Sequence, residues 1–211
     1  APPEIYTLSL HDALPISFLG GLMYMLAPSF VSLVHPAHDA KMYVTAFLPL
    51  AFMLLEMLME APRVWKAALL GGVMGLLILT SHVQMAYYSY WALGLWFLYR
   101  LYTRRSDGGL ALALRSGLFV ISVALALGLG LVQLLPSYKF TTAQSVRSGE
   151  ARTSYEYATS WSMHPEEVAG MIVPSFQGFQ KGIGFEDNFY WGRNPFKLNS
   201  EYNGILPILF A

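Results

Sequence analysis

The sequence contains no cysteine, little charge and no net charge. The absence of cysteine excludes disulfides, CxxC redox chemistry and cysteine metal ligands. In 211 residues, 13 Lys and Arg balance 13 Asp and Glu, so we expect no basic face for nucleic acid. Charged residues make up 12% of the chain, against roughly 25% in soluble domains. Together with 55% hydrophobic residues, this composition predicts an all-α polytopic membrane protein.

The first 17 residues have neither the basic start nor the apolar centre of a secretory signal peptide. Residues 4–16, EIYTLSLHDALPI, resemble the translation of a common sequencing-adapter DNA. We therefore interpret 1–17 as a non-native segment. The alternative is a genuine extracytoplasmic loop, in which His11 and Asp12 would be candidate site residues. Because 204–211 reads as the start of another membrane helix, we expect the chain to be an internal fragment of a longer protein.

Five apolar segments approach the ~20 helical residues that cross a hydrocarbon core of about 30 Å. Pro28 and Pro49 are expected to kink the first two, and Pro136 to end the last. The predicted membrane helices are 18–34, 42–59, 67–85, 87–102 and 117–135.

Two of the short turns between these helices are basic. One carries Arg63 and Lys66, and the other carries four arginines against Asp107 only (Arg100, Arg104, Arg105 and Arg115). An excess of Lys and Arg marks the cytoplasmic side. This rule places the opposite segments on the extracytoplasmic face, namely 35–41, 80–91 and 137–203.

The long external segment 137–203 is rich in aromatic residues and punctuated by Gly and Pro. This composition favours compact turns over disorder, so we predict an ordered cap over the outer helix ends. His164 to about Ile172 is predicted to form a short helix, because Pro165 and two Glu residues suit a first turn. The segment contains no Walker A, GxSxG or HExxH motif, and neither does the rest of the chain.

The first candidate site residues cluster at the outer mouth of the first two predicted helices: His35, His38, Asp39 and Lys41. If the second helix starts early, His35, His38 and Asp39 share one face. Imidazole and carboxylate groups there could bind a divalent cation, and Lys41 could bind a phosphate. Asp39 is also a candidate catalytic residue. In the structural alternative, Asp39 caps the helix and the other side chains lie among lipid headgroups.

A second cluster, Thr80, Ser81, His82 and Gln84, lies at the outer end of the third predicted helix. His82 in a cavity could act as a general acid or base, and Gln84 could bind substrate. Hydrogen bonding between helices is the alternative for both. The aromatic residues that follow are expected to form an interfacial belt, with a sugar platform as the alternative (Tyr87, Tyr88, Tyr90 and Trp91).

Further polar residues lie deeper in the membrane and in the cap. Glu56 could relay protons, but a pairing with Arg63 or Lys66 is the simpler interpretation. In the cap, Arg193, Glu201 and Tyr202 are predicted to bind substrate. Taken singly, the cap acids, including Glu166 and Glu167, are expected to be solvated loop charges.

The order of these landmarks resembles a known family. HPAHDAKMYVTAFLPLAF, TSHVQMAYY, VPSFQGF, YWGRNPF and EYNGILPILFA, spread over 18–211, are similar to segments of the YfhO-like bacterial membrane proteins. That family is similar to the GT-C glycosyltransferases. The resemblance implies a GT-C-like helix bundle in the bacterial inner membrane, with the cap outside the cell.

The resemblance further implies transfer of a sugar from a polyprenyl-phosphate carrier. GT-C glycosyltransferases typically carry their catalytic acid in the loop after the first membrane helix. In this chain the resemblance implies that this acid would lie upstream of Ser17, outside the fragment. The expected partners are a lipid-linked sugar donor and membrane lipids. Two other functions remain open: a transporter or flippase for a lipid-linked substrate, and a noncatalytic scaffold subunit.

Overall fold

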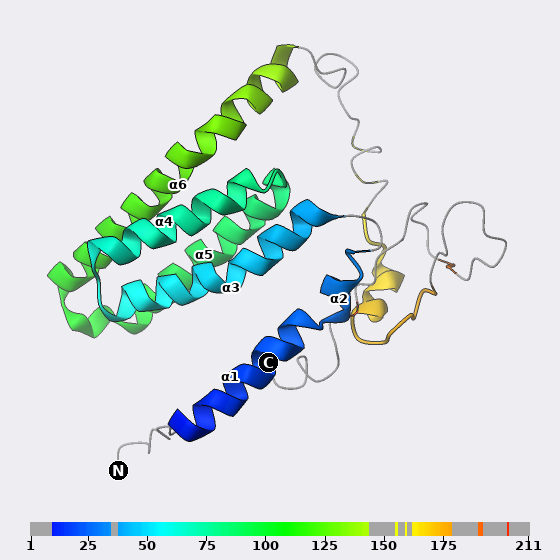
Figure 1. Cartoon of the computed structure of the whole chain (residues 1–211), viewed down its shortest axis with the longest axis horizontal. Helices are drawn as coiled ribbons and strands as arrows, with labels where there is room; N and C mark the ends of the chain where they lie inside the picture. Colours follow the sequence, from blue (N-terminus) through cyan, green and yellow to red (C-terminus); the bar gives the residue numbers. More distant parts are fainter. Residues whose placement is uncertain are drawn as a thin grey trace. The chain divides into compact units, whose positions relative to one another are not determined.

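The computed structural model describes residues 10–34, 38–143, 155, 159, 162–178, 190, 191 and 202. Every regular element within these ranges is a helix, which confirms the all-α class (Figure 1). The chain divides into two compact units. One comprises Ala1–His38 with Glu156–Ala211, and the other comprises Asp39–Tyr155.

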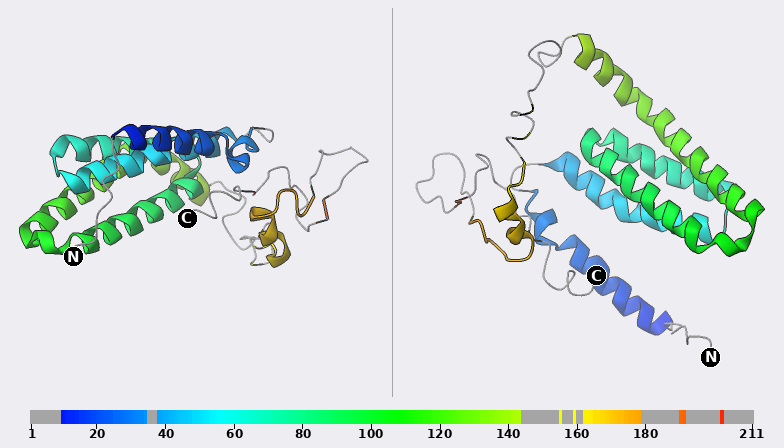
Figure 2. Two further views of the ribbon diagram at one scale, coloured as in Figure 1. Left: turned by 90° about the horizontal axis from the view of Figure 1, so that it is seen from below. Right: turned by 180° about the vertical axis from the view of Figure 1, so that it is seen from behind.

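The second unit is a bundle of four helices: α3 (Asp39–Glu60), α4 (Val64–Leu79), α5 (Val83–Thr103) and α6 (Gly109–Ala143). Short turns join successive helices, and a 3-10 turn, η1 (Arg105–Asp107), lies between α5 and α6. Figures 1 and 2 show α4 antiparallel to α3 and α5, with the N-terminal half of α6 along α4. The start of α3, the α4–α5 turn and the end of α6 therefore share one end of the bundle.

Helices α4 and α6 approach closely because glycines line their contact. A Cβ atom on Gly71 would lie 2.7 Å from the carbonyl oxygen of Ser122, and one on Gly130 would lie 2.7 Å from Ile78. Small residues at this spacing bring helix backbones together in membranes. The hydroxyl of Ser122 also donates to the carbonyl of Ala67, at 2.9 Å, which links the two helices directly.

The core of this unit lies between α3, α4 and α5. Large aliphatic side chains from all three helices are almost fully buried there: Leu54, Leu55, Leu58, Leu70, Met74, Leu77 and Leu93. Phe97 of α5 stacks on Phe119 of α6 at a centroid distance of 4.1 Å. The outer faces remain apolar and exposed, as expected for helices that face lipid.

The first unit contains α1 (Leu10–Met25), α2 (Pro28–Val31) and η2, a 3-10 helix (Pro165–Met171). The chain breaks between α1 and α2 because Pro28 disfavours helical geometry at Ala27, whose ψ is 129°. The predicted short helix near His164 is confirmed by η2, although it is 3-10 rather than α-helical. Since α1 begins at Leu10, it runs through part of the adapter-like segment.

Three of the described segments are long and apolar enough to cross a membrane: Leu14–Val31, Asp39–Glu60 and Gly109–Ala143. Helix α4 is apolar but has only 16 residues. Helix α5 has 21 residues and is not among the three, because its tyrosines and polar residues lower its hydropathy. Membrane-spanning character is therefore supported for three of the five predicted spans.

Several predicted helix boundaries are wrong. The helix predicted over 117–135 begins at Gly109, and the helix predicted over 87–102 begins at Val83. The helix predicted over 67–85 ends at Leu79, where the hydroxyl of Thr80 donates to Leu77 O and Ser81 takes the left-handed φ of 68°. The helix predicted to end before Pro136 continues to Ala143. Hydroxyl groups after Pro136 bond to carbonyls one turn back, including Ser137 to Gln133 at 2.8 Å, and these bonds support the extension.

We predict that Gly71→Ala destabilises the bundle by about 1–3 kcal/mol, because the new methyl group meets backbone that can move only with the whole of α6. Thermal unfolding in detergent micelles measures the effect. Gly72→Ala is the matched control, since nothing lies within 4 Å of its Cβ position. Equal destabilisation by both substitutions would contradict the close approach of α4 and α6.

Candidate functional site

The turn between α4 and α5 holds His82 in a defined orientation. His82 is the N-cap of α5, and its Nδ1 accepts a hydrogen bond from the backbone N–H of Met85 at 3.2 Å. The ring is half-buried, and its Nε2 makes no hydrogen bond within the described part of the chain. This second nitrogen is therefore the one available to a ligand.

Lys41 acts electrostatically on His82. It lies in the first turn of α3, half-buried, at the same end of the bundle. Burial first, and the Lys41 charge second, lower the pKa of His82 below its ordinary value of 6.5. The two side chains sit at helix N-termini, where the backbone dipole favours negative charge. Together they form a site suited to an anion, which we call the Lys41–His82 pair.

The remaining predicted residues of this bundle end are more exposed. Asp39 begins α3 and is exposed, where its charge suits the helix dipole. Gln84 donates from Nε2 to the hydroxyl of Tyr88 at 3.1 Å. Tyr87 and Trp91 are both 57% exposed and contact each other edge to face. This pattern fits an interfacial belt, the first of the two interpretations above.

The shared face predicted for His35, His38 and Asp39 is wrong for His38. Helix α3 begins only at Asp39, and the backbone N–H of His38 instead donates to Leu33 O at 3.0 Å. His38 and Tyr202 belong to the first unit, whereas Asp39 belongs to the second. His35, Arg193 and Glu201 lie outside the described residues. Convergence of the cap on the bundle stays a prediction.

Two apolar cavities adjoin the Lys41–His82 end. The first, of about 190 Å³, begins at Val83 next to His82 and is lined by α4, α5 and α6. The second, of about 600 Å³, continues along α5 and α6. Both are lined by Tyr87 and Tyr90, so they are neighbours along α5, and we call the two cavities together the apolar path.

The described part of the cap contains a buried acid that sequence reasoning missed. Glu167 is 1% exposed and accepts a hydrogen bond from the hydroxyl of Tyr190 at 2.8 Å. The expectation of a solvated loop charge is therefore wrong for Glu167. Nearby, the indole of Trp191 donates to Phe176 O at 3.0 Å. The signal for this small core was the aromatic content of the segment, but the two partners are 23 residues apart in the sequence.

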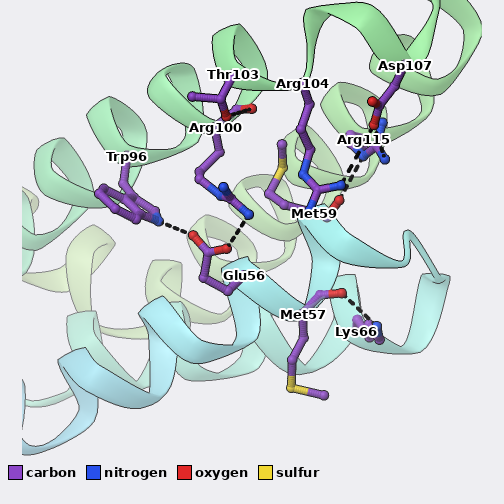
Figure 3. Close-up of polar contacts among 10 residues, drawn as sticks. All are labelled: Glu56, Met57, Met59, Lys66, Trp96, Arg100, Thr103, Arg104, Asp107 and Arg115. Atoms are coloured by element: carbon purple, nitrogen blue, oxygen red, sulfur yellow. Dashed lines mark hydrogen bonds and ion pairs between the residues drawn. The ribbon is translucent and has the colours of Figure 1, made fainter. Parts of the chain in front are cut away.

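At the opposite end of the bundle, Glu56 pairs with α5 (Figure 3). Its carboxylate lies 2.9 Å from Nη2 of Arg100 and accepts a hydrogen bond from the indole of Trp96. The predicted pairing of Glu56 with Arg63 or Lys66 is therefore wrong. Lys66 instead donates from Nζ to Met57 O at 2.6 Å. A salt bridge between α3 and α5 is thus the observed role of Glu56.

At the same end, Arg115 of α6 binds both the end of α3 and the turn between α5 and α6. Its Nε donates to Met59 O at 2.9 Å, and its Nη2 lies 2.9 Å from the carboxylate of Asp107. Cationic groups at helix C-termini satisfy the last carbonyls and favour the helix dipole. Sequence reasoning identified these cations through the basic turns but not their bonds to the end of α3.

No group of three or more His, Cys, Asp or Glu side chains placed to hold a metal ion occurs within the described residues. The arrangement at the Lys41–His82 pair therefore suggests anion binding more directly than direct metal ligation.

We predict that His82 titrates with a midpoint below 6.5 in the folded protein, measured by NMR of labelled histidine in detergent. The folded state then binds fewer protons than the unfolded state, so stability declines as the pH falls through about 6.5. Lys41→Met is expected to raise the midpoint only partly, because burial is the larger cause. Lys139→Met, on an exposed part of α6, is the control and leaves it unchanged.

We predict that Glu56→Gln lowers the free energy of unfolding by about 1–2 kcal/mol, because a charge-assisted bond between α3 and α5 is lost. Glu60→Gln, on the exposed side of α3, is expected to change it by less than about 0.5 kcal/mol. Both variants are measured by reversible unfolding in micelles. Unchanged stability of Glu56→Gln, together with lost proton-coupled uptake into vesicles, would favour a transport role instead.

The site thus consists of a cation and an imidazole at paired helix ends, next to an apolar path. Comparison of the chain with protein-family models, curated protein sequences and solved structures gives no match. The function is therefore argued from the chemistry of these residues.

Proposed function

We propose that the chain is part of a membrane glycosyltransferase that takes a sugar from a polyprenyl-phosphate carrier on the extracytoplasmic face. The observation that supports this most is the Lys41–His82 pair at the mouth of an apolar path. A lipid-phosphate substrate has the same two parts, a compact anion and a long apolar chain. Each part has a counterpart at this end of the bundle.

The phosphate is assigned to Lys41. A lysine ammonium binds phosphate as a point charge, and its place in the first turn of α3 adds the favourable helix dipole. The lowered pKa of His82 keeps its ring neutral near pH 7, and because Nδ1 accepts the Met85 N–H, Nε2 carries the proton and can donate a hydrogen bond to a phosphate oxygen. A neutral ring also avoids a second full charge beside Lys41.

The apolar chain of the carrier is assigned to the path along α5 and α6. Its two cavities of about 190 and 600 Å³ are lined almost entirely by aliphatic and aromatic side chains. The path starts one residue after His82, at Val83. A chain lying there would keep its phosphate beside the Lys41–His82 pair.

In the proposed reaction, an acceptor hydroxyl attacks the anomeric carbon of the sugar. The bond between that carbon and the phosphate oxygen breaks, the hydroxyl proton passes to a base, and the polyprenyl phosphate leaves. Asp39 is the candidate base within this chain, with the acid implied by the family resemblance upstream, and Nε2–H of His82 can donate a hydrogen bond to the leaving phosphate. Lys41 would stabilise the negative charge that develops on the leaving phosphate.

The proposed topology puts the arginine-containing turns in the cytoplasm and the Lys41–His82 pair outside. The excess of Lys and Arg at one end of the bundle supports this orientation. A transporter receives less support, because the deep acid Glu56 is bound to Arg100 and Trp96. Any divalent cation would have to be held largely by the phosphate itself.

Binding is tested with the purified chain in phosphatidylcholine nanodiscs, titrated with a polyprenyl phosphate and with the corresponding polyprenol. We expect the phosphate form to bind more tightly. Lys41→Met is expected to reduce that preference about tenfold, the loss of one charge-assisted interaction. Lys139→Met is the matched control and is expected to change it less than twofold. Equal binding of alcohol and phosphate would contradict the proposal.

Transfer is tested in the full-length protein with a radiolabelled polyprenyl-phosphate sugar. We expect His82→Ala to lower the transfer rate by about 100-fold while donor binding persists, as for loss of a hydrogen-bond donor to the leaving phosphate. Bound donor without transfer by the unsubstituted protein would indicate a flippase or a scaffold.

A further inference from the structure

The end of the bundle opposite His82 carries an excess of positive charge, and we call it the arginine end. It comprises the end of α3, the α3–α4 turn and the α5–α6 turn. Three acidic side chains lie there, Glu56, Glu60 and Asp107, against six cations. The cations are Arg63, Lys66, Arg100, Arg104, Arg105 and Arg115.

Two of the three acidic side chains at this end already form close ion pairs with an arginine. Glu56 binds Arg100, and Asp107 binds Arg115, each at 2.9 Å. Arg104 reaches Asp107 only at 3.8 Å, which is too long for a hydrogen bond. Its guanidinium group is therefore the least satisfied of the three arginines.

Several buried donors at the arginine end have no partner within the described part of the chain. They are Nε of Arg100, Nε of Arg104 and Nη1 of Arg115. Arg115 is only 6% exposed. Because a buried donor without a hydrogen-bond partner destabilises the folded state, such a cluster is expected to attract an anion. Figure 3 shows the side chain of Arg104 between those of Arg100 and Arg115.

Aromatic side chains mark this end as a membrane boundary. Trp65 is 48% exposed, and Nζ of Lys66 lies 5.7 Å from its ring centroid. Tyr102 is 65% exposed and carries the guanidinium of Arg105 at 4.4 Å. Exposed aromatic rings beside cations are typical of the level where lipid headgroups lie.

We propose that the arginine end binds the phosphate of an anionic membrane lipid, with Arg104 as the principal ligand and Arg100 and Arg115 beside it. A guanidinium group presents two parallel donors that match phosphate oxygens, which suits Arg better than Lys. The lipid tails would lie along the apolar outer faces of the helices. This site is separate from the Lys41–His82 pair, because helix α5 spans about 32 Å between the two ends.

The proposal requires insertion in a membrane, but it does not depend on sugar transfer. The ligand chemistry, a phosphate oxyanion, could come from a lipid or from free phosphate. The exposed aromatic rings beside cations at this end favour the lipid, and the experiment separates the two sources.

The test uses the full chain in detergent, with lipid retention counted by native mass spectrometry. Dioleoylphosphatidylglycerol is compared with dioleoylphosphatidylcholine and with inorganic phosphate. We expect one phosphatidylglycerol to be retained preferentially and to raise the unfolding temperature. Inorganic phosphate at equal concentration is expected to do neither.

The deciding variants are Arg104→Lys and Arg63→Lys, which both keep the positive charge. Arg104→Lys is expected to weaken phosphatidylglycerol retention about tenfold, since it removes one of two charge-assisted bonds. Arg63→Lys alters an exposed cation of the same end and is expected to change it less than twofold. A circular dichroism melt checks that both variants fold.

Three results would overturn the proposal. Equal retention of the two lipids would show that the arginine end does not distinguish an anionic headgroup from a zwitterionic one. Unchanged retention in Arg104→Lys would show diffuse attraction by net charge. Stabilisation by inorganic phosphate equal to that by the lipid would assign the site to a soluble anion.

Discussion

The close contact between α4 and α6 is the constraint on which the bundle depends. Gly71 and Gly130 let the two backbones approach until a single added methyl group would meet a carbonyl or a branched side chain. Lipid tails are as apolar as the helix surfaces, so hydrophobicity alone does not hold helices together in a membrane. Close packing and the bond from Ser122 to Ala67 O supply that attraction here.

This packing gives the two ends of the bundle different chemistry. One end carries Lys41, in the first turn of α3, and His82, which is the N-cap of α5. The apolar path begins next to His82. At the other, Arg115 of α6 donates to the carbonyl of Met59 and Arg100 of α5 pairs with the carboxylate of Glu56. The excess of positive charge therefore lies at the arginine-containing end, and the Lys41–His82 pair combines a single lysine with a neutral imidazole.

The fold class and the polar clusters were predictable from the sequence because they depend on composition and on short spacings. Helix boundaries were less predictable from the sequence. The left-handed turn at Ser81 and the continuation of α6 through Pro136 depend on local hydrogen bonds. Partners distant in sequence were not predictable. The Glu56–Arg100 pair needs the relative rotation of α3 and α5, and the burial of Glu167 needs Tyr190 to reach it.

The candidate site also has one part that the sequence predicted and one part that it did not. His82 and Lys41 stood out as polar residues next to apolar helices, and the structure couples their charges. His38 was expected on the same helix face, but the helix begins one residue later. Sequence reasoning can place a residue near a helix end, but the capping bonds decide on which side of that end it lies.

Helices α4 and α6 differ greatly in length although they pack side by side. At 1.5 Å per residue, α4 is about 24 Å long and α6 about 52 Å. A hydrocarbon layer of about 30 Å exceeds the first and falls short of the second. In a bilayer, α4 would require local thinning or flanking side chains that reach the headgroups, whereas α6 would tilt or project beyond the surface. A change in bilayer thickness would therefore act differently on these two helices.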